Sequence, residues 1–147
     1  MSAPFRTPNG QITGFDEIYA QLKAMGPAVG GQALRQATFA ASLPALRQVQ
    51  ISAPVGTRAH RSYKKRLVLP GFLKAHIRRM SFLSHSRTQA TVLIGPSQSA
   101  FYAKFIELGK KGYPRRPFIE PAFKRSRQQM LYRLRVELTD RINKAIK

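Results

Sequence analysis

The sequence predicts an α+β fold with helices at the N-terminus, a small antiparallel β-sheet and a long C-terminal helix. Apolar residues recur at helical spacing near both ends of the chain, and two short apolar runs separated by a polar loop lie between them. With 147 residues and 43% hydrophobic content, the chain can bury one modest core. We therefore expect a flexible arm over residues 1–12 and a single domain over 13–147.

Two helices are expected in the first third of the chain. The first covers residues 14–25, where Thr13 and Asp16 resemble a capping box. Its apolar residues at helical spacing are Phe15, Ile18, Leu22 and Met25. Gly26-Pro27 is expected to end this helix, and Gly30-Gly31 to form a flexible link. The second helix covers 32–51, and Pro44 should kink it or split it in two.

A β-hairpin and a long helix are expected in the remainder. The strands cover residues 76–82 and 89–94, and the polar residues 84–88 form their loop. Pro121 suits the first turn of the final helix, where a missing backbone N–H costs nothing. The apolar stripe of that helix comprises Phe123, Leu131, Leu134, Leu138, Ile142 and Ile146.

Charge is the feature of composition that bears most on function. The 26 lysines and arginines face only six acids, which gives a formal net charge of +20. Self-repulsion of this size favours an anionic partner. Residues 58–79 contain eight of these cations and no acid, with Tyr63 and Phe72 among them. The candidate DNA- or anion-facing residues are Arg58, Arg61, Lys64, Lys65, Arg66, Lys74, Arg78 and Arg79. No helix-turn-helix or zinc-finger pattern is present, so the expected binding is independent of nucleotide sequence.

Several classes of function are disfavoured. The chain has no cysteine, which excludes disulfides and thiolate metal sites. His60, His76 and His85 have no carboxylate or second histidine at ligand spacing. There is no G-x-S-x-G elbow, Walker loop or G-x-G-x-x-G motif. We expect no enzymatic activity, cofactor or metal. The N-terminus lacks the apolar core of a signal peptide, and no window suits a membrane span, so a soluble protein is expected.

Two linked motifs stand out in the second half of the chain. Residues 70–77 read Pro-Gly-Phe-Leu-Lys-Ala-His-Ile. Residues 102–109 read Tyr-Ala-Lys-Phe-Ile-Glu-Leu-Gly, and residues 116–122 follow as Arg-Pro-Phe-Ile-Glu-Pro-Ala. In order and spacing these motifs resemble those of the neck and tail-completion proteins of long-tailed, lambdoid-type phages, in which the first motif leads into the sheet. The resemblance covers about residues 15–146. The chain departs from the family pattern in the lysines after Gly109 and in a basic insert over about 57–69.

The resemblance implies a structural protein of the virion, assembled in the host cytoplasm. It would form a homo-oligomeric ring, of six subunits, at the head–tail junction, beside head-closure and tail-terminator or tail-tube proteins. Double-stranded DNA would pass through the ring without sequence-specific contacts. The implied subunit-interface residues are Tyr102, Phe105, Glu107, Gly109 and Phe118.

Glu107 stands out because carboxylates are scarce in this chain. Flanked by Phe105 and Leu108, it would be partly desolvated and would need a cation to remain charged, which a neighbouring subunit could supply. A solvated surface acid is the other interpretation. Gly109 would permit a positive φ, and Phe118 would anchor the start of the last helix.

A second function from a different class fits the charge equally well. The chain could be a small nucleic-acid-binding protein of ribosomal or nucleoid type that acts independently of sequence. A neck protein should form rings or join a partner ring without nucleic acid. A nucleoid protein should instead coat DNA as a monomer or dimer.

Overall fold

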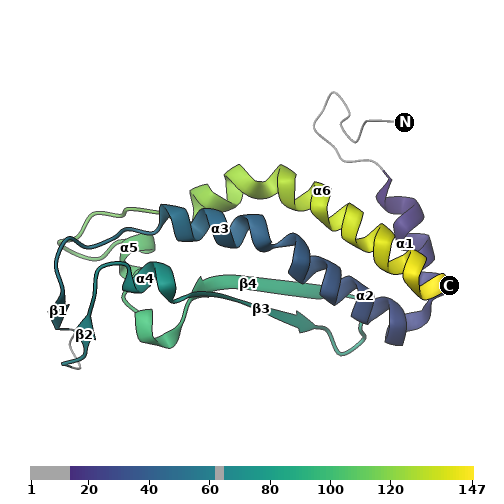
Figure 1. Ribbon diagram of the computed structural model, residues 1–147, viewed down its shortest axis with the longest axis horizontal. Helices are drawn as coiled ribbons and strands as arrows, with labels where there is room; N and C mark the ends of the chain where they lie inside the picture. Colours follow the sequence, from purple (N-terminus) through teal and green to yellow (C-terminus); the bar gives the residue numbers. More distant parts are fainter. Residues whose placement is uncertain (1–13, 62–64) are drawn as a thin grey trace. The chain divides into compact units, whose positions relative to one another are not determined.

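The computed structural model describes residues 14–61 and 65–147 and has the expected α+β class (Figure 1). It contains helices, two separate two-stranded antiparallel sheets and a long C-terminal helix. The proposed arm over 1–12, the capping residue Thr13, and Tyr63 and Lys64 lie outside the described residues. The described residues form two compact units: unit 1 comprises 14–44, 80–93 and 127–147, and unit 2 comprises 45–61, 65–79 and 94–126.

Unit 1 is built on α1 (Phe15–Ala24), α2 (Gly26–Ala41) and the last part of α6 (Ile119–Ile146). The expected helix over 14–25 is therefore confirmed. A buried cluster joins these helices, because their apolar faces have the spacing needed to pack together. Its fully buried members are Ile18, Ala37, Leu138 and Ile142, and the side chains packed around them are Phe15, Leu22, Met25, Leu34 and Leu134.

The expected flexible link at the glycine pair is wrong. Gly26 and Pro27 begin α2, and Gly30 and Gly31 are buried within that helix. A Cβ atom on Gly30 would lie 2.5 Å from the carbonyl oxygen of Leu22 in α1. A Cβ atom on Gly31 would lie 2.6 Å from the carbonyl oxygen of Arg87. Both glycines thus permit close approach of another backbone segment to α2.

Replacing Gly31 with alanine is expected to destabilise the protein. The new methyl group would overlap the backbone of Arg87, so the net loss should be about 1–3 kcal/mol even though alanine favours helix. Gly56→Ala is the matched control, because its Cβ would meet nothing closer than 3.9 Å. Urea denaturation of both variants provides the measurement. Equal stabilities of the two variants would contradict the close packing at Gly31.

The second expected helix is split, as the position of Pro44 predicts. α2 ends at Ala41, and α3 (Leu43–Ser52) begins after Ser42, whose hydroxyl donates to the carbonyl of Phe39 at 2.7 Å. Pro44 occupies the first turn of α3, where no intrahelical N–H bond is required. The division between the two units falls directly after this proline.

Unit 2 combines α3 with short elements from the middle of the chain. These are β1 (His60–Arg61), β2 (Leu67–Val68), α4 (Phe72–Ala75), a 3-10 turn (Gln98–Ala100), α5 (Ala103–Leu108) and the start of α6. Its buried cluster comprises Val49, Ala53, Leu73, Ile77, Ala100, Ala103, Phe118 and Ala122. The many alanines allow the helices in this cluster to approach closely.

The strands β3 (Ile77–Leu83) and β4 (Ala90–Pro96) form the expected hairpin. The backbone N–H of Ser84 donates to the carbonyl of Gln89 at 2.8 Å, which closes the polar turn between them. The strand positions differ from the predicted ones by one or two residues, as is usual for element ends.

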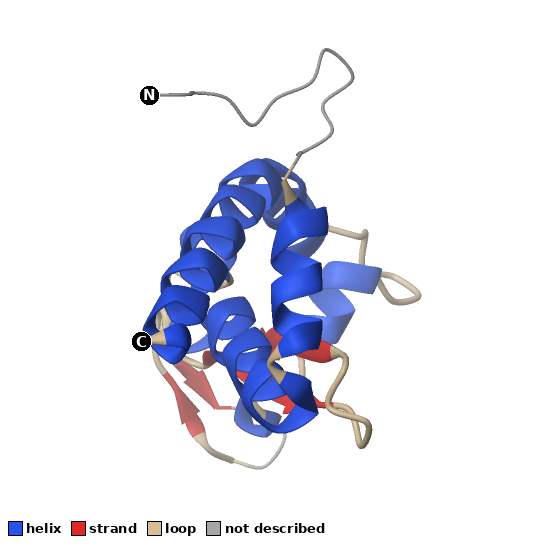
Figure 2. Cartoon of the chain, turned by 90° about the vertical axis from the view of Figure 1, so that its right-hand side faces the viewer, coloured by secondary structure: helices blue, strands red, loops and turns tan. Residues whose placement is uncertain are grey.

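α6 is the longest element, and most of the described residues are helical (Figure 2). Pro121 lies in the first turn of α6, as expected. Leu138 and Ile142 of the predicted stripe are buried, and Leu131 and Leu134 are half-buried. Ile146 is 67% exposed, so the stripe does not extend to the end of the helix.

Candidate assembly and anion-binding surfaces

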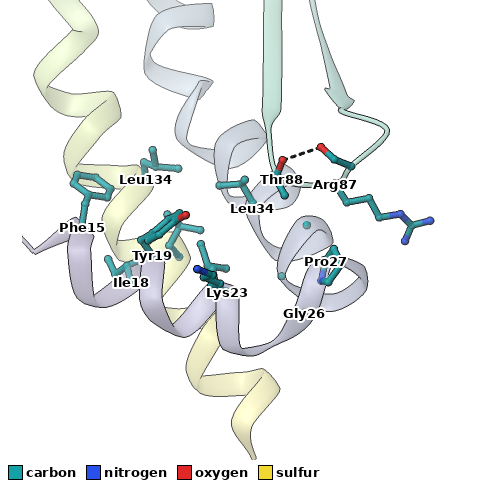
Figure 3. Close-up of a pocket in the computed structure, with 15 residues that line it drawn as sticks. Phe15, Ile18, Tyr19, Lys23, Gly26, Pro27, Leu34, Arg87, Thr88 and Leu134 are labelled. Carbon is teal, nitrogen blue, oxygen red and sulfur yellow. Dashed lines mark hydrogen bonds between the residues drawn. The ribbon is translucent and has the colours of Figure 1, made fainter.

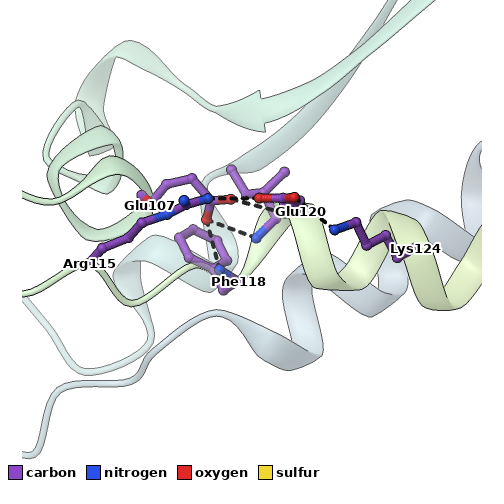
Figure 4. Close-up of polar contacts among 6 residues, drawn as sticks. Glu107, Arg115, Phe118, Glu120 and Lys124 are labelled. Carbon is purple, nitrogen blue, oxygen red and sulfur yellow. Dashed lines mark hydrogen bonds and ion pairs between the residues drawn. The ribbon is translucent and has the colours of Figure 1, made fainter.

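Glu107 lies at the end of α5 and binds the first turn of α6 in its own chain (Figure 4). The backbone N–H groups of Phe118 and Ile119 donate to its Oε2 at 2.7 and 3.0 Å. The N–H of Glu120 donates to its Oε1 at 3.0 Å. N–H groups at a helix N-terminus have no partner within the helix, so the carboxylate satisfies three of them and opposes the positive end of the helix dipole.

The electrostatics of this contact favour the charged form of Glu107. Partial burial alone would raise the pKa of the carboxyl group. The hydrogen bonds from Ile119, Glu120 and Phe118, together with the nearby Arg115 guanidinium, outweigh burial and lower the pKa below its ordinary value of 4.5. Glu107 is therefore an anion at neutral pH.

Arg115 holds the loop between α5 and α6 against both helices. Its Nε donates to the carbonyl of Glu107 at 3.0 Å, and its Nη2 pairs with Oε2 of Glu120 at 2.7 Å. Lys124 pairs with the other carboxylate oxygen of Glu120 at 2.9 Å. Gly109 has a φ of 78°, as expected, and its Cβ position would be 3.2 Å from the backbone nitrogen of Arg115. The loop therefore requires glycine there for conformation and for space.

These contacts show that the Glu107 carboxylate is held within its own chain. The cationic partner sought on a neighbouring subunit is not needed, because donors of the same chain hold the carboxylate. Phe118 is only 4% exposed and belongs to the core of unit 2, so it anchors the start of α6 rather than offering a surface to another subunit. Tyr102 and Phe105 are half-buried, and Tyr102 packs against the same core.

Phe105 is half-buried, and two cations lie near its ring. The Nζ atoms of Lys104 and Lys110 lie 5.0 and 5.1 Å from the centre of the ring, within the range of a cation–π interaction. Of the five predicted interface residues, Tyr102, Phe105, Glu107 and Gly109 are half-buried and keep some surface that a partner could reach, whereas Phe118 is buried.

The basic insert forms a short β-hairpin in unit 2. His60 pairs with Val68 and Arg61 with Leu67 in antiparallel register. Val68 is the buried side chain of this pair of strands, and the others are exposed. The cations Arg58, Arg61, Lys65 and Arg66 are also exposed. The basic hairpin, defined here as residues 58–61 and 65–68, therefore presents its charges to solvent.

The other predicted anion-facing residues also belong to unit 2. Lys74 on α4 and Arg78 on β3 are exposed, whereas Arg79 is half-buried. Arg66 is close to the turn before α5, where its Nη1 donates to the Ser99 hydroxyl at 3.3 Å. Every described member of the predicted set thus lies in one unit, and Lys64 lies outside the described residues.

The β3–β4 hairpin has an exposed apolar face that sequence reasoning missed. Exposure alternates along both strands, so the exposed residues of the two strands share one face of the sheet. On that face Met80 is 57%, Phe82 48% and Leu93 54% exposed. We call these three residues the apolar sheet face. Apolar residues occur on both sides of β3, so the sequence pattern of this strand does not distinguish an exposed apolar face from a buried one.

The histidines and acids of the described residues do not gather into a candidate metal site. Within 14–61 and 65–147 there is no group of three or more His, Cys, Asp or Glu that could hold a metal ion. His60 and His85 are exposed, and the His76 ring stacks on Phe72 with 3.8 Å between ring centres. No helix in this part of the chain has the length and apolar character needed to cross a membrane.

Comparison with models of known protein families finds no match for the chain, and searches of curated proteins and of solved structures find none either.

Proposed function

We propose that the protein is a structural subunit of a ring at the head–tail junction of a long-tailed phage, where it contributes to tail completion and head–tail joining. The apolar sheet face is the observation that carries this proposal. Three large side chains about half exposed on a sheet of only two strands are typical of a surface that another protein covers. The two motifs over residues 70–77 and 102–122 support the same function through their resemblance to neck proteins.

A second copy of the chain is the partner that this face fits best. The sheet has only two strands, so β3 and β4 are both edge strands, and edge strands can pair with further strands. A ring uses one contact repeated around an axis, so one apolar face and a complementary patch on the next subunit are sufficient. Head-closure and tail-terminator or tail-tube proteins would stack above and below the ring in the virion.

The charge of the protein suits a channel through which DNA passes. Six copies with +20 each would carry about +120, and such self-repulsion requires counter-charge. Duplex DNA supplies one negative charge for about every 1.7 Å of its axis. In the proposed ring the basic hairpin faces this channel or an acidic neighbouring ring.

Replacing Met80 and Phe82 together with serine is expected to abolish the ring and leave the monomer folded. Both side chains are about half exposed, so truncating them removes apolar area between subunits rather than core packing. Ile51→Ser is the control, since Ile51 is 67% exposed on α3 and lies outside both the apolar sheet face and the predicted interface residues. Sedimentation velocity would report the assembly and circular dichroism the fold. A double variant that assembles like the wild type would exclude this face from the subunit contact.

Replacing Arg58, Arg61, Lys65 and Arg66 with glutamine is expected to weaken DNA binding without a loss of fold, because these side chains are exposed. Each cation that no longer binds a phosphate should reduce the slope of log K against log salt by about 0.9. Fluorescence anisotropy with duplexes of unrelated sequence measures this slope. The control variant replaces four exposed cations outside the basic hairpin with glutamine. These are Lys23, Lys124, Arg125 and Arg127. Equal slopes for both variants would contradict a specific role for the basic hairpin.

A small nucleic-acid-binding protein of nucleoid or ribosomal type is the second candidate. The concentration of exposed cations in the basic hairpin favours it, because basic side chains on a short two-stranded arm can follow a phosphate backbone. In this case DNA binding would not require a ring, and the serine substitutions at Met80 and Phe82 would leave DNA binding unchanged.

A further inference from the structure

Unit 1 contains an apolar groove with a volume of about 470 Å³ (Figure 3). Residues of α1 form one wall, and the first two turns of α2 form the opposite wall. Leu134 and Leu138 of α6 and the turn at Arg87 complete the lining. We call this the α1–α2 groove.

Three of the residues that line the groove from α2 have no side chain. Gly26, Gly30 and Gly31 line the α2 wall, and a Cβ at Gly26 would meet nothing within 4 Å. On the opposite wall Tyr19 is 67% exposed and Phe15 half-buried, so aromatic surface faces the open space. A volume of this size lies within the range of about 300–1,000 Å³ typical of ligand sites.

The charged residues of the lining are both basic. Lys23 comes from α1 and Arg87 from the hairpin turn (Figure 3). The guanidinium of Arg135 lies against Gly14, next to Phe15 at the start of α1. The acids of α1, Asp16 and Glu17, are exposed and do not line the groove. An occupant with apolar side chains and negative charges would therefore complement this surface.

We infer that the α1–α2 groove binds an acidic amphipathic helix of a partner protein. A helix satisfies its own backbone hydrogen bonds and presents apolar side chains at i, i+3 or i+4, and i+7 to such a groove. An extended strand would need an unpaired sheet edge, and the lining consists of helix residues and a turn. Carboxylates on the α1 side of the bound helix would lie near Lys23, and carboxylates at the outer rim of the groove would lie near Arg87, whose side chain extends away from α1 in Figure 3. This inference concerns unit 1 alone and does not depend on the ring or on DNA.

The probe is a synthetic helical peptide of 20 residues. It carries leucines at i, i+3 or i+4, and i+7, and glutamates on its polar face. Two control peptides carry lysine in place of glutamate, or serine in place of leucine. NMR titration should show binding of the acidic leucine peptide, with shifts at Tyr19, Gly30 and Thr88. Both control peptides should bind at least about tenfold more weakly at these residues. Comparable binding by the serine peptide would show that the net charge alone attracts it, and would overturn the inference.

The variant Lys23→Glu/Arg87→Glu locates the binding site. It should weaken binding of the acidic peptide about tenfold, whereas Lys111→Glu/Arg127→Glu, with the same change in net charge at exposed residues, should have a much smaller effect. Equal losses in the two variants, or shifts confined to the basic hairpin, would contradict the groove as the site. Dodecanoate binding at the same residues without peptide binding would also overturn the inference, because the groove would then be a small-molecule site.

Discussion

Replacing Phe118 with alanine is expected to lower the free energy of unfolding by about 3–5 kcal/mol. The side chain is only 4% exposed and packs within the core of unit 2, beside Phe123 and Ala122 of α6. Truncation removes the ring from this core and leaves a cavity that the surrounding helices fill only in part. Its backbone N–H also donates to Glu107, so a shifted chain at this position would weaken the start of α6.

Chemical denaturation measures this loss, and Phe101→Ala provides the matched control. Phe101 lies two residues before the start of α5 and is 45% exposed, so its truncation should cost much less. A loss below about 1 kcal/mol for Phe118→Ala would mean that the ring does not anchor the core.

Replacing Glu107 with alanine is expected to destabilise the fold by about 2–3 kcal/mol. Three N–H groups at the N-terminus of α6 would lose their acceptor, two of which are partly buried. The loss should appear in the isolated protein, because all three donors belong to the same chain. Glu120→Gln is the control, since that carboxylate forms only exposed ion pairs and such pairs contribute little. If Glu107→Ala unfolds like the wild type but fails to assemble, the subunit-interface interpretation is right instead.

The stabilisation by Glu107 should depend on pH in a defined direction. Its pKa in the folded protein is lowered from the ordinary value of 4.5, so the folded state favours the ionised form. The stabilisation is therefore complete above pH 4.5 and is lost as the pH falls through the lowered pKa. The difference in stability between the wild type and Glu107→Gln should shrink below pH 4.5. A difference that stays constant down to pH 2 would exclude ionisation of Glu107 as its source.

Local features of the sequence predicted the helices and the hairpin well. The spacing from Phe15 to Met25, the proline at 44 and the proline at 121 act within one or two turns of helix, so their effects can be inferred without tertiary information. The β3–β4 strands were found because β-branched and apolar residues border a polar turn.

The features that the sequence did not predict depend on contacts between distant segments. The partners of Glu107 lie 11 to 13 residues further along the chain, and a scan for local capping patterns does not reach them. Gly30 and Gly31 indicate a flexible link when considered alone. Only the approach of Leu22 and Arg87 shows that they are needed for close packing.

The candidate assembly surface was missed for a related reason. Met80 and Phe82 are apolar residues of a strand with imperfect alternation, so the sequence alone does not show which face of the sheet they occupy. The structure shows that Ile77 and the half-buried Leu83 lie on the other face of the sheet, which leaves Met80 and Phe82 on the exposed face. The positions of the basic residues were easier to predict, because charged side chains remain exposed in most local structures.

Native mass spectrometry of the purified protein, alone and with DNA duplexes of two lengths, tests the proposed ring most directly. We expect a closed assembly of fixed copy number without DNA, with six chains of 16.5 kDa giving about 99 kDa. The copy number should not change with the length of the duplex. A monomer or dimer that binds DNA in numbers proportional to duplex length would contradict the ring and support the nucleoid-type function.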